Sequence, residues 1–179
     1  MIYNGQSKAT DVDRGAAAYE RIPRSMAHSV FEVDTFIEVP PTTVRDFLSS
    51  LNNHMQIHPL IIQIQQMETT DRPDGLKVDH YRIRDRMKLG PFTIQFTYRV
   101  EMSIKPTGEI VSDAYQSPGI HLQNTTWCMT EGNGTRLREL VEIYAPGLLI
   151  QTVHQNGLEA HKKMFAKLKK VLEDAYIPA

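Results

Sequence analysis

The sequence predicts an α+β fold in which a curved antiparallel sheet of about seven strands wraps around one long C-terminal helix. Segments of alternating apolar and polar residues recur from residue 28 to residue 144, which is the period of half-buried strands. From about Leu148 to Tyr176 the period becomes helical. With 179 residues the chain suits one domain with a real core. We expect that domain at residues 28–179, preceded by an N-terminal arm at residues 1–27.

The first strand is expected at His28–Val39, where apolar and polar residues alternate. Two prolines end it, and a short helix capped by Thr42 or Thr43 should then run to Leu51. A second helical turn around Asn53–His58 must stop there, because the residue before a proline is driven out of the helical region.

Six further strands should lie between residues 60 and 144, separated by turns rich in Gly, Pro, Asp and Asn. They are Leu60–Met67, the two arms of a hairpin within Val78–Ile104, Glu109–Gln116, Ile120–Met129 and Thr135–Tyr144.

The C-terminal helix carries one apolar stripe at steps of three and four residues, and at 1.5 Å per residue it would be roughly 40 Å long. A sheet of this size must bury its inner face, and only this helix is long enough to cover it. The stripe is narrow at Gly157 and Ala160. Small residues there either allow close contact with the sheet or leave space for a ligand, and close contact is the commoner outcome.

The hairpin at Val78–Ile104 is the most informative segment. In its second arm seven apolar residues alternate with six polar ones, so one face is buried and the other is wet. The apolar face of its first arm carries a single carboxylate, Asp85. An apolar face that contains a polar group is typical of either a core or a ligand cavity.

Three local strings add to the element order: VPPTTV at residues 39–44, NHMQIHP at residues 53–59, and the late pair WCM at 127–129 and GTRL at 134–137. Together they resemble the START/Bet v 1-like (SRPBCC) superfamily over about residues 28–176, nearest to its polyketide cyclase/dehydrase and lipid-transport branch. The resemblance implies a helix-grip fold with a hollow between sheet and helix that takes an apolar small molecule. It also implies a mouth where the short helices meet the turns at residues 89–91 and 117–119.

Composition excludes several classes. A net charge of -1 lacks the basic field of a nucleic-acid binder, and no segment has the roughly 18 apolar residues of an integral membrane span. A single cysteine, Cys128, fits a reducing compartment, and residues 1–25 lack a secretory signal, so we expect a cytoplasmic protein. No phosphate-binding or dinucleotide motif predicts a cofactor. The sequence indicates neither the ligand nor the oligomeric state.

Asp85 and Glu139 are the candidate acid/base residues. A carboxylate on an apolar strand face costs several kcal/mol unless it is paired. Asp85 therefore either anchors a ligand with a raised pKa, or turns outward at a bulge, or pairs with a neighbouring arginine. Glu139 presents the same alternatives.

The histidines predict little chemistry. His54 and His58 have a spacing that can bind metal on a helix, but a proline follows directly and no third ligand accompanies them, so we expect no metal site. His154 and His161 share a face of the long helix and should lie at the edge of its apolar stripe. The expected ligand-binding residues are Tyr81, Ile83, Asp85, Met87, Phe96, Tyr98, Trp127, Glu139, Val153, Gly157 and Met164.

The predicted function is the binding, transport or sensing of a hydrophobic small molecule such as a lipid, sterol, isoprenoid or polyketide. The alternative is a polyketide cyclase, aromatase or dehydratase in which Asp85 and Glu139 move protons. A third class, an interaction module without a ligand, would have a filled core and an exposed apolar patch.

Overall fold

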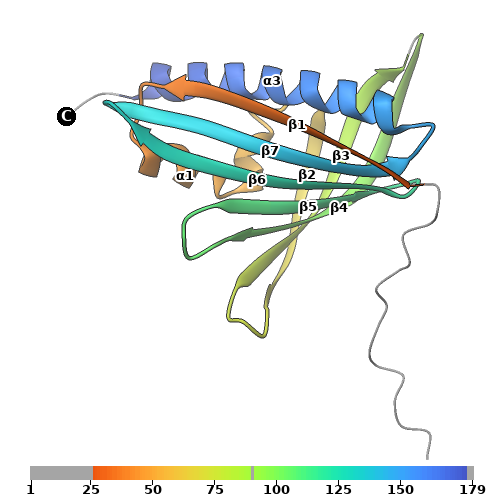
Figure 1. Ribbon diagram of the computed structural model, residues 1–179, viewed down its shortest axis with the longest axis horizontal. Coiled ribbons are helices and arrows are strands. Elements are labelled where there is room, and N and C mark those ends of the chain that lie inside the picture. The colour runs from red at the N-terminus through yellow and green to blue at the C-terminus, as the bar shows by residue number, and fades with distance from the viewer. Residues whose placement is uncertain (1–25, 90, 177–179) are drawn as a thin grey trace, which may run out of the picture.

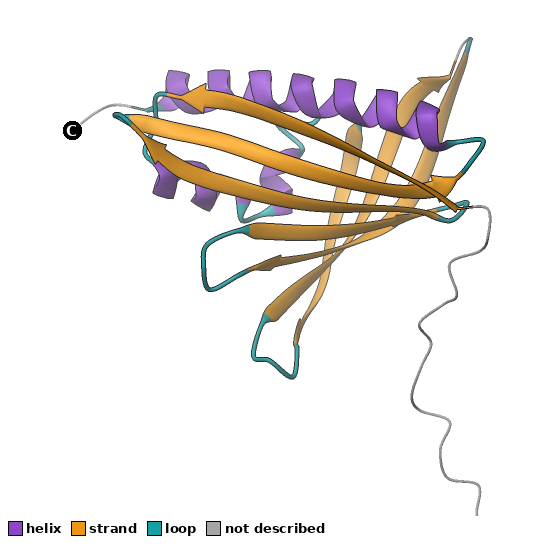
Figure 2. Cartoon of the chain, in the orientation of Figure 1, coloured by secondary structure: helices purple, strands orange, loops and turns teal. Residues whose placement is uncertain are grey.

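A computed structural model describes residues 26–89 and 91–176, so nearly all of the predicted N-terminal arm lies outside the described residues. Within them the predicted fold is confirmed. One seven-stranded antiparallel sheet curves around a long helix, and two short helices follow the first strand (Figures 1 and 2). The elements are β1 (Met26–Ile37), α1 (Pro41–Leu48), α2 (Leu51–His54), β2 (Ile61–Asp71), β3 (Lys77–Leu89), β4 (Phe92–Ile104), β5 (Ile110–Gln116), β6 (Ile120–Glu131), β7 (Gly134–Pro146) and α3 (Ile150–Ala175).

The strands lie in the order β1-β7-β6-β5-β4-β3-β2, so every neighbour except β1 and β7 is also consecutive in sequence. The register of β3 with β4 is unbroken from Asp79↔Met102 to Leu89↔Phe92. Strand β2 is less regular, because its register with β3 shifts between Ile61 and Gln63 and again between Gln66 and Thr69. Strands β1 and β2 form the two edges of the sheet.

Helix α3 packs along β1 and β7 at one side of the sheet, while β2, β3 and β4 splay away from it (Figure 1). Helix α1 packs on β6 and β7, and Arg45 lies beside Gly108 in the β4–β5 turn. The short helices therefore close the end of the fold that holds the β4–β5 and β6–β7 turns. The expectation that they meet the turn at residues 117–119 is wrong, because β6 runs from that turn to the opposite end.

The core is tightest under the C-terminal half of α3. There Phe165 and Leu168 are buried against the sheet, together with Ile57 from the segment after α2. The N-terminal half of α3 is only partly covered, as Val153 and Leu158 are half-buried. The fold thus has a closed end at α1 and an open end at the β3–β4 hairpin, the β5–β6 turn and the β7–α3 loop.

Gly157 brings α3 close to β1. A Cβ atom at this position would lie 3.2 Å from the ring of Phe31, which is tighter than an ordinary contact. Of the two outcomes that the sequence left open, close contact with the sheet is the one observed.

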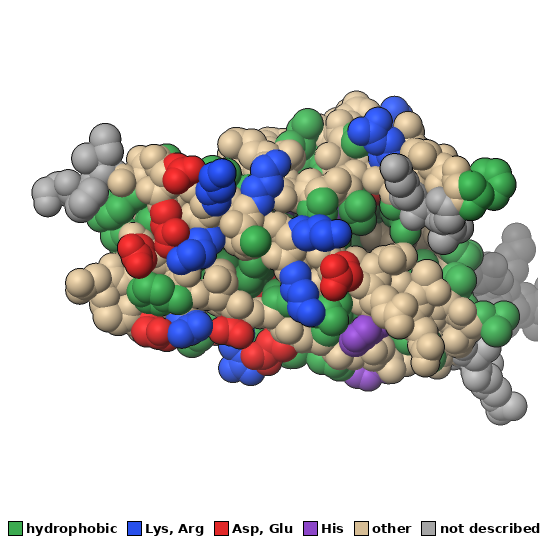
Figure 3. All heavy atoms as spheres, turned by 90° about the horizontal axis from the view of Figure 1, so that it is seen from above, with side chains coloured by type: hydrophobic (Ala, Val, Ile, Leu, Met, Phe, Trp, Pro, Cys, Tyr) green, Lys and Arg blue, Asp and Glu red, His purple; other side chains and the backbone are tan. Residues whose placement is uncertain are grey.

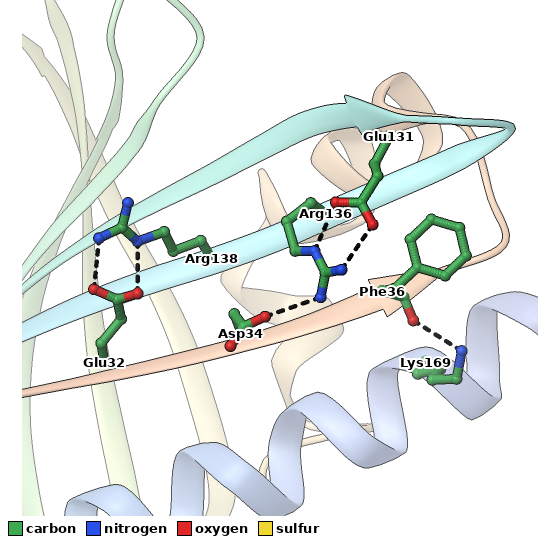
Figure 4. A network of polar contacts seen from close by, with 7 residues as sticks. All are labelled: Glu32, Asp34, Phe36, Glu131, Arg136, Arg138 and Lys169. Carbon is green, nitrogen blue, oxygen red and sulfur yellow. Dashed lines mark hydrogen bonds and ion pairs between the residues drawn. The ribbon is translucent and has the colours of Figure 1, made fainter.

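Charged side chains on the outer face of β1 and β7 pair with one another (Figure 4). Arg138 donates two hydrogen bonds to Glu32, at 2.7 and 2.6 Å. Arg136 bridges Glu131 and Asp34, with its closest nitrogen–oxygen distances at 2.7 and 3.0 Å. This half of the outer face is therefore balanced in charge.

We expect Gly134→Ala to lower the free energy of unfolding by about 2–3 kcal/mol, since overpacking of a tight site costs that much. A Cβ atom there would collide with the backbone carbonyl oxygen of Ile37 and lie 2.8 Å from the ring of Phe36. Urea denaturation measures the change. Gly132→Asn is the control in the same turn, because its φ of +55° tolerates Asn and nothing lies within 4 Å. Equal stability of Gly134→Ala and the wild type would contradict the expectation.

Candidate functional site

The inner face of the β3–β4 hairpin passes from the core to solvent at the open end. Along β4 the exposed fraction rises from 5% at Val100 and 9% at Tyr98 to 37% at Ile94 and 69% at Phe92. These residues share one face of the strand, so they form a continuous apolar wall. The wall thus runs from the buried core to the solvent at the open end of the fold.

Asp85 lies on this wall at the depth where burial becomes complete. Its side chain is 3% exposed, and its register partner is Phe96. The Tyr98 hydroxyl donates a 3.1 Å hydrogen bond to Asp85 Oδ2. Burial raises the pKa of Asp85 to about 6, although the Tyr98 hydrogen bond acts in the opposite direction. With this pKa, the Asp85 carboxyl group can both donate and accept a proton near neutral pH.

The second carboxylate oxygen, Asp85 Oδ1, is buried and has no hydrogen-bond partner among the described residues. A buried polar atom without a partner costs about 1–3 kcal/mol and is rare in native proteins. Of the alternatives for Asp85, neither the outward turn nor the arginine pair is observed. The side chain points inward and is incompletely satisfied.

A second polar cluster lies across the interior, between β7 and α3. His161 Nδ1 lies 2.5 Å from Glu139 Oε2, and Thr126 donates a 3.3 Å hydrogen bond to Glu139 Oε1. Glu139 is 5% exposed and His161 8%. Burial alone lowers the pKa of His161, but the Glu139 carboxylate outweighs it and holds that pKa above its usual value.

Two further histidines surround this pair. The ring of His58 stands perpendicular to that of His161, with centroids 6.1 Å apart. Burial lowers the pKa of His58 to about 3, and the neighbouring His161 and His54 act in the same direction. Burial also lowers the pKa of His54. Both rings are therefore neutral near pH 7, and the contact between Glu139 and His161 forms the centre of the cluster.

The structure brings together most, but not all, of the predicted ligand-binding residues. Trp127 lies on the outer face of β6, opposite Arg138, whose guanidinium carbon is 5.8 Å from the indole centroid. It therefore does not face the interior. Gly157 faces Phe31 and Met164 is buried in the core. On the inner wall of β3 and β4 or at its open end lie Tyr81, Ile83, Asp85, Met87, Phe96 and Tyr98.

Sequence reasoning missed the partners of both carboxylates. It named Asp85 and Glu139 as candidate acid/base residues, and the structure shows that Asp85 contacts Tyr98 and that Glu139 contacts His161. A signal for His161 was present, because it lies four residues after Gly157 and three before Met164, on the helix stripe itself.

A hollow of about 520 Å³ opens beside the hairpin, lined by Pro59, Leu60, Arg86, Met87 and Thr93. It is wide open to solvent, and its volume lies within the range of small-molecule sites. Viewed from the side of α3, the surface is also hollowed beside the helix, with hydrophobic side chains at the rim (Figure 3).

The described residues contain no group of three or more His, Cys, Asp or Glu side chains placed to hold a metal ion. None of their helices is long and apolar enough to cross a membrane.

No protein-family model matches the chain, and no curated protein matches it in sequence. Solved structures do match, and they show that the chain has the START/Bet v 1-like helix-grip fold that the sequence resemblance implied. At these sequence identities the similarity defines the fold alone.

Three of these structures illustrate the range of proteins that share the fold. TTHA0849 from Thermus thermophilus is 16% identical with a TM-score of 0.61, covering 83% of this chain and 100% of that one. The di-domain ARO/CYC StfQ from the steffimycin biosynthetic pathway is 13% identical with a TM-score of 0.65, covering 82% of this chain and 51% of StfQ. This chain thus spans about half the length of StfQ. A START superfamily protein from Mycobacterium smegmatis is 14% identical with a TM-score of 0.56, covering 81% of this chain and 99% of that one.

Proposed function

We propose that this chain binds a hydrophobic small molecule, such as a lipid, sterol, isoprenoid or polyketide, along the inner wall of β3 and β4. The observation that carries the proposal is the unpartnered, buried Asp85 Oδ1 on that apolar wall. A ligand hydroxyl or amide would donate to this oxygen and remove the cost of leaving it unsatisfied. We call the open end of this wall, together with the hollow that Met87 helps to line, the trough; in the proposal the ligand enters there, because the closed end of the fold is filled by its own core.

The apolar wall supplies the affinity in this proposal. Met87, Ile94 and Phe96 lie at the open end of the wall and are only partly buried, so a ligand would remove their remaining apolar area from water. Each Å² of such area contributes about 25 cal/mol. Asp85 and Tyr98 would fix the orientation of the ligand, as the few polar groups of an apolar site commonly do.

Native mass spectrometry of the purified protein, followed by extraction, tests whether an apolar compound co-purifies. Titration with Nile red then measures access to the trough. We expect Asp85→Leu to lower the affinity for the extracted compound at least tenfold, because a hydrogen bond to a charged group contributes about 1.5–3 kcal/mol. Glu32→Gln on the outer face is the matched control and should bind normally. The proposal would be overturned if the protein binds neither Nile red nor a co-purified apolar compound. It would also be overturned if Asp85→Leu keeps the affinity of the wild type.

The raised pKa of Asp85 favours a second candidate, an enzyme of the cyclase, aromatase or dehydratase type. A carboxyl group with a pKa of about 6 can exchange a proton with substrate near neutral pH, and Tyr98 is in place to support it. If turnover of a linear poly-β-keto thioester is lost in Asp85→Asn while affinity is kept, the enzyme is favoured. If the wild type binds the thioester without turnover, the carrier is favoured.

A further inference from the structure

The open end of the fold exposes large apolar side chains. Leu148 in the β7–α3 loop is 99% exposed, and Phe92 and Ile94 at the start of β4 are 69% and 37% exposed. The β3–β4 hairpin and the β7–α3 loop project from the same end of the molecule (Figure 1), and hydrophobic side chains gather there in the space-filling view (Figure 3). Exposed apolar side chains that gather at one end of a fold are typical of an interaction site.

The three segments at the tip of this end carry no acidic residue, and the carboxylates of Asp113 and Glu142 on the adjoining strands lie beside His121 and His28. The three segments are residues 87–93, 116–120 and 146–153. The first turn of α3 also has no acidic residue, so the partial positive charge of that helix end is not compensated there. The apolar rim is therefore set in a neutral to positive surrounding.

Four arginines extend this positive region over the outer face of β3 and β4. They are exposed, and within the described part of the chain none has a carboxylate at ion-pair distance, unlike Arg136 and Arg138 on β7. Two of them stand directly opposite each other in the register, an arrangement of like charges that costs stability in a sheet. These arginines are Arg82, Arg84, Arg86 and Arg99.

We infer that the open end of the fold docks on an anionic lipid bilayer. Leu148 and Phe92 enter the boundary between headgroups and acyl chains, and Arg86 and Arg84, the two arginines nearest the hairpin tip, contact the lipid phosphates. A protein surface with exposed apolar residues beside basic residues binds membranes through both contributions together. The proposal goes beyond the proposed function, because it concerns the bilayer and not the molecule in the trough.

Co-sedimentation with phosphatidylcholine vesicles, with and without phosphatidylglycerol, tests the proposal. We expect binding only when phosphatidylglycerol is present, and weaker binding as salt is raised. Arg84→Gln with Arg86→Gln should weaken binding about fivefold per arginine, and Leu148→Ser should weaken it about tenfold. The matched control is Lys162→Gln with Lys163→Gln, which removes the same charge from the exposed face of α3 and should leave binding unchanged.

Three results with vesicles would overturn the proposal: no binding to either vesicle, equal loss of binding in the lysine control, or unchanged binding of Leu148→Ser. Preference for single-stranded nucleic acid or an acidic protein over the vesicles would also overturn it. Binding of the co-purified compound, measured on the same variants without vesicles, reports on the ligand site. Failure of membrane docking is thereby distinguished from failure of ligand binding.

Discussion

Asp85→Asn is expected to raise the free energy of unfolding by up to about 3 kcal/mol at about pH 8. The wild-type carboxyl group has a pKa of about 6 in the folded protein, compared with 3.8 as its ordinary value. Each unit of that difference corresponds to about 1.4 kcal/mol. The buried carboxylate thus destabilises the fold when it is ionised, and a neutral amide of the same shape avoids that cost.

The direction of the change in unfolding free energy follows from how Asp85 titrates in the folded and unfolded states. Because folding raises the pKa of Asp85, the folded state holds the proton more tightly between about pH 4 and pH 6. Asp85 therefore favours folding below that window, and the advantage is lost as the pH rises through it. The difference between Asp85→Asn and the wild type should be absent at about pH 3.5 and fully developed above about pH 7.

Urea denaturation across this range measures the effect, and Tyr98→Phe provides the control. That variant removes the one hydrogen bond that the carboxylate accepts. It should therefore destabilise the protein most at high pH, opposite in sign to Asp85→Asn. An Asp85→Asn variant that is less stable than the wild type at about pH 8 would contradict the conclusion that burial of the ionised Asp85 carboxylate destabilises the fold.

Removing one partner of the buried Glu139–His161 pair is expected to cost about 3–5 kcal/mol of stability. In His161→Leu the Glu139 carboxylate would remain buried at 5% exposure with only the 3.3 Å hydrogen bond from Thr126. Replacing both residues, as in Glu139→Leu with His161→Leu, should bring stability back to within about 1 kcal/mol of the wild type. A double-mutant cycle at pH 7 measures the coupling.

The cycle also tests whether the two residues contact each other in solution. Strong coupling requires the 2.5 Å contact between His161 Nδ1 and Glu139 Oε2. Lys163→Leu, an exposed position on the same helix, is the control and should not couple to Glu139→Leu. Additive single-variant losses would show that the pair is not formed.

The fold could be predicted because its periodic segments are long. The arms of the hairpin, β3 and β4, are 13 residues long and alternate over most of that length, and α3 is a helix of 26 residues with one apolar stripe. Such patterns leave little choice of which face is buried. The same alternation placed Asp85 on the inner face, and there the structure agrees with the prediction.

Trp127 shows where the pattern failed. The inner face of β6 continues from Leu122 through Asn124 and Thr126, so its deeper positions are polar. Without apolar residues to mark the face, the large indole at the next position suggested the interior. Counting strictly in steps of two from Leu122 would have assigned Trp127 to the outer face.

The pairing of Glu139 with His161 could not be predicted, for a different reason. The two residues lie on a strand and on the helix that follows it, 22 positions apart. Whether they meet depends on the rotation of α3 over the sheet, which is set by contacts such as that between Gly157 and Phe31. Spacing places His161 on the apolar stripe of the helix, but it does not tell which residue of the sheet faces that part of the stripe.

The two register shifts in β2 bear on how the protein behaves at high concentration. The opposite edge strand, β1, lies beside α3, whereas β2 is the strand left at the other end of the sheet (Figure 1). A long, flat free edge can pair with the edge of another molecule and start aggregation. Each irregularity interrupts the row of free backbone groups and bends the strand, so β2 offers only short segments for pairing. The two register shifts of β2 thus protect the protein against edge-to-edge aggregation with other copies of itself.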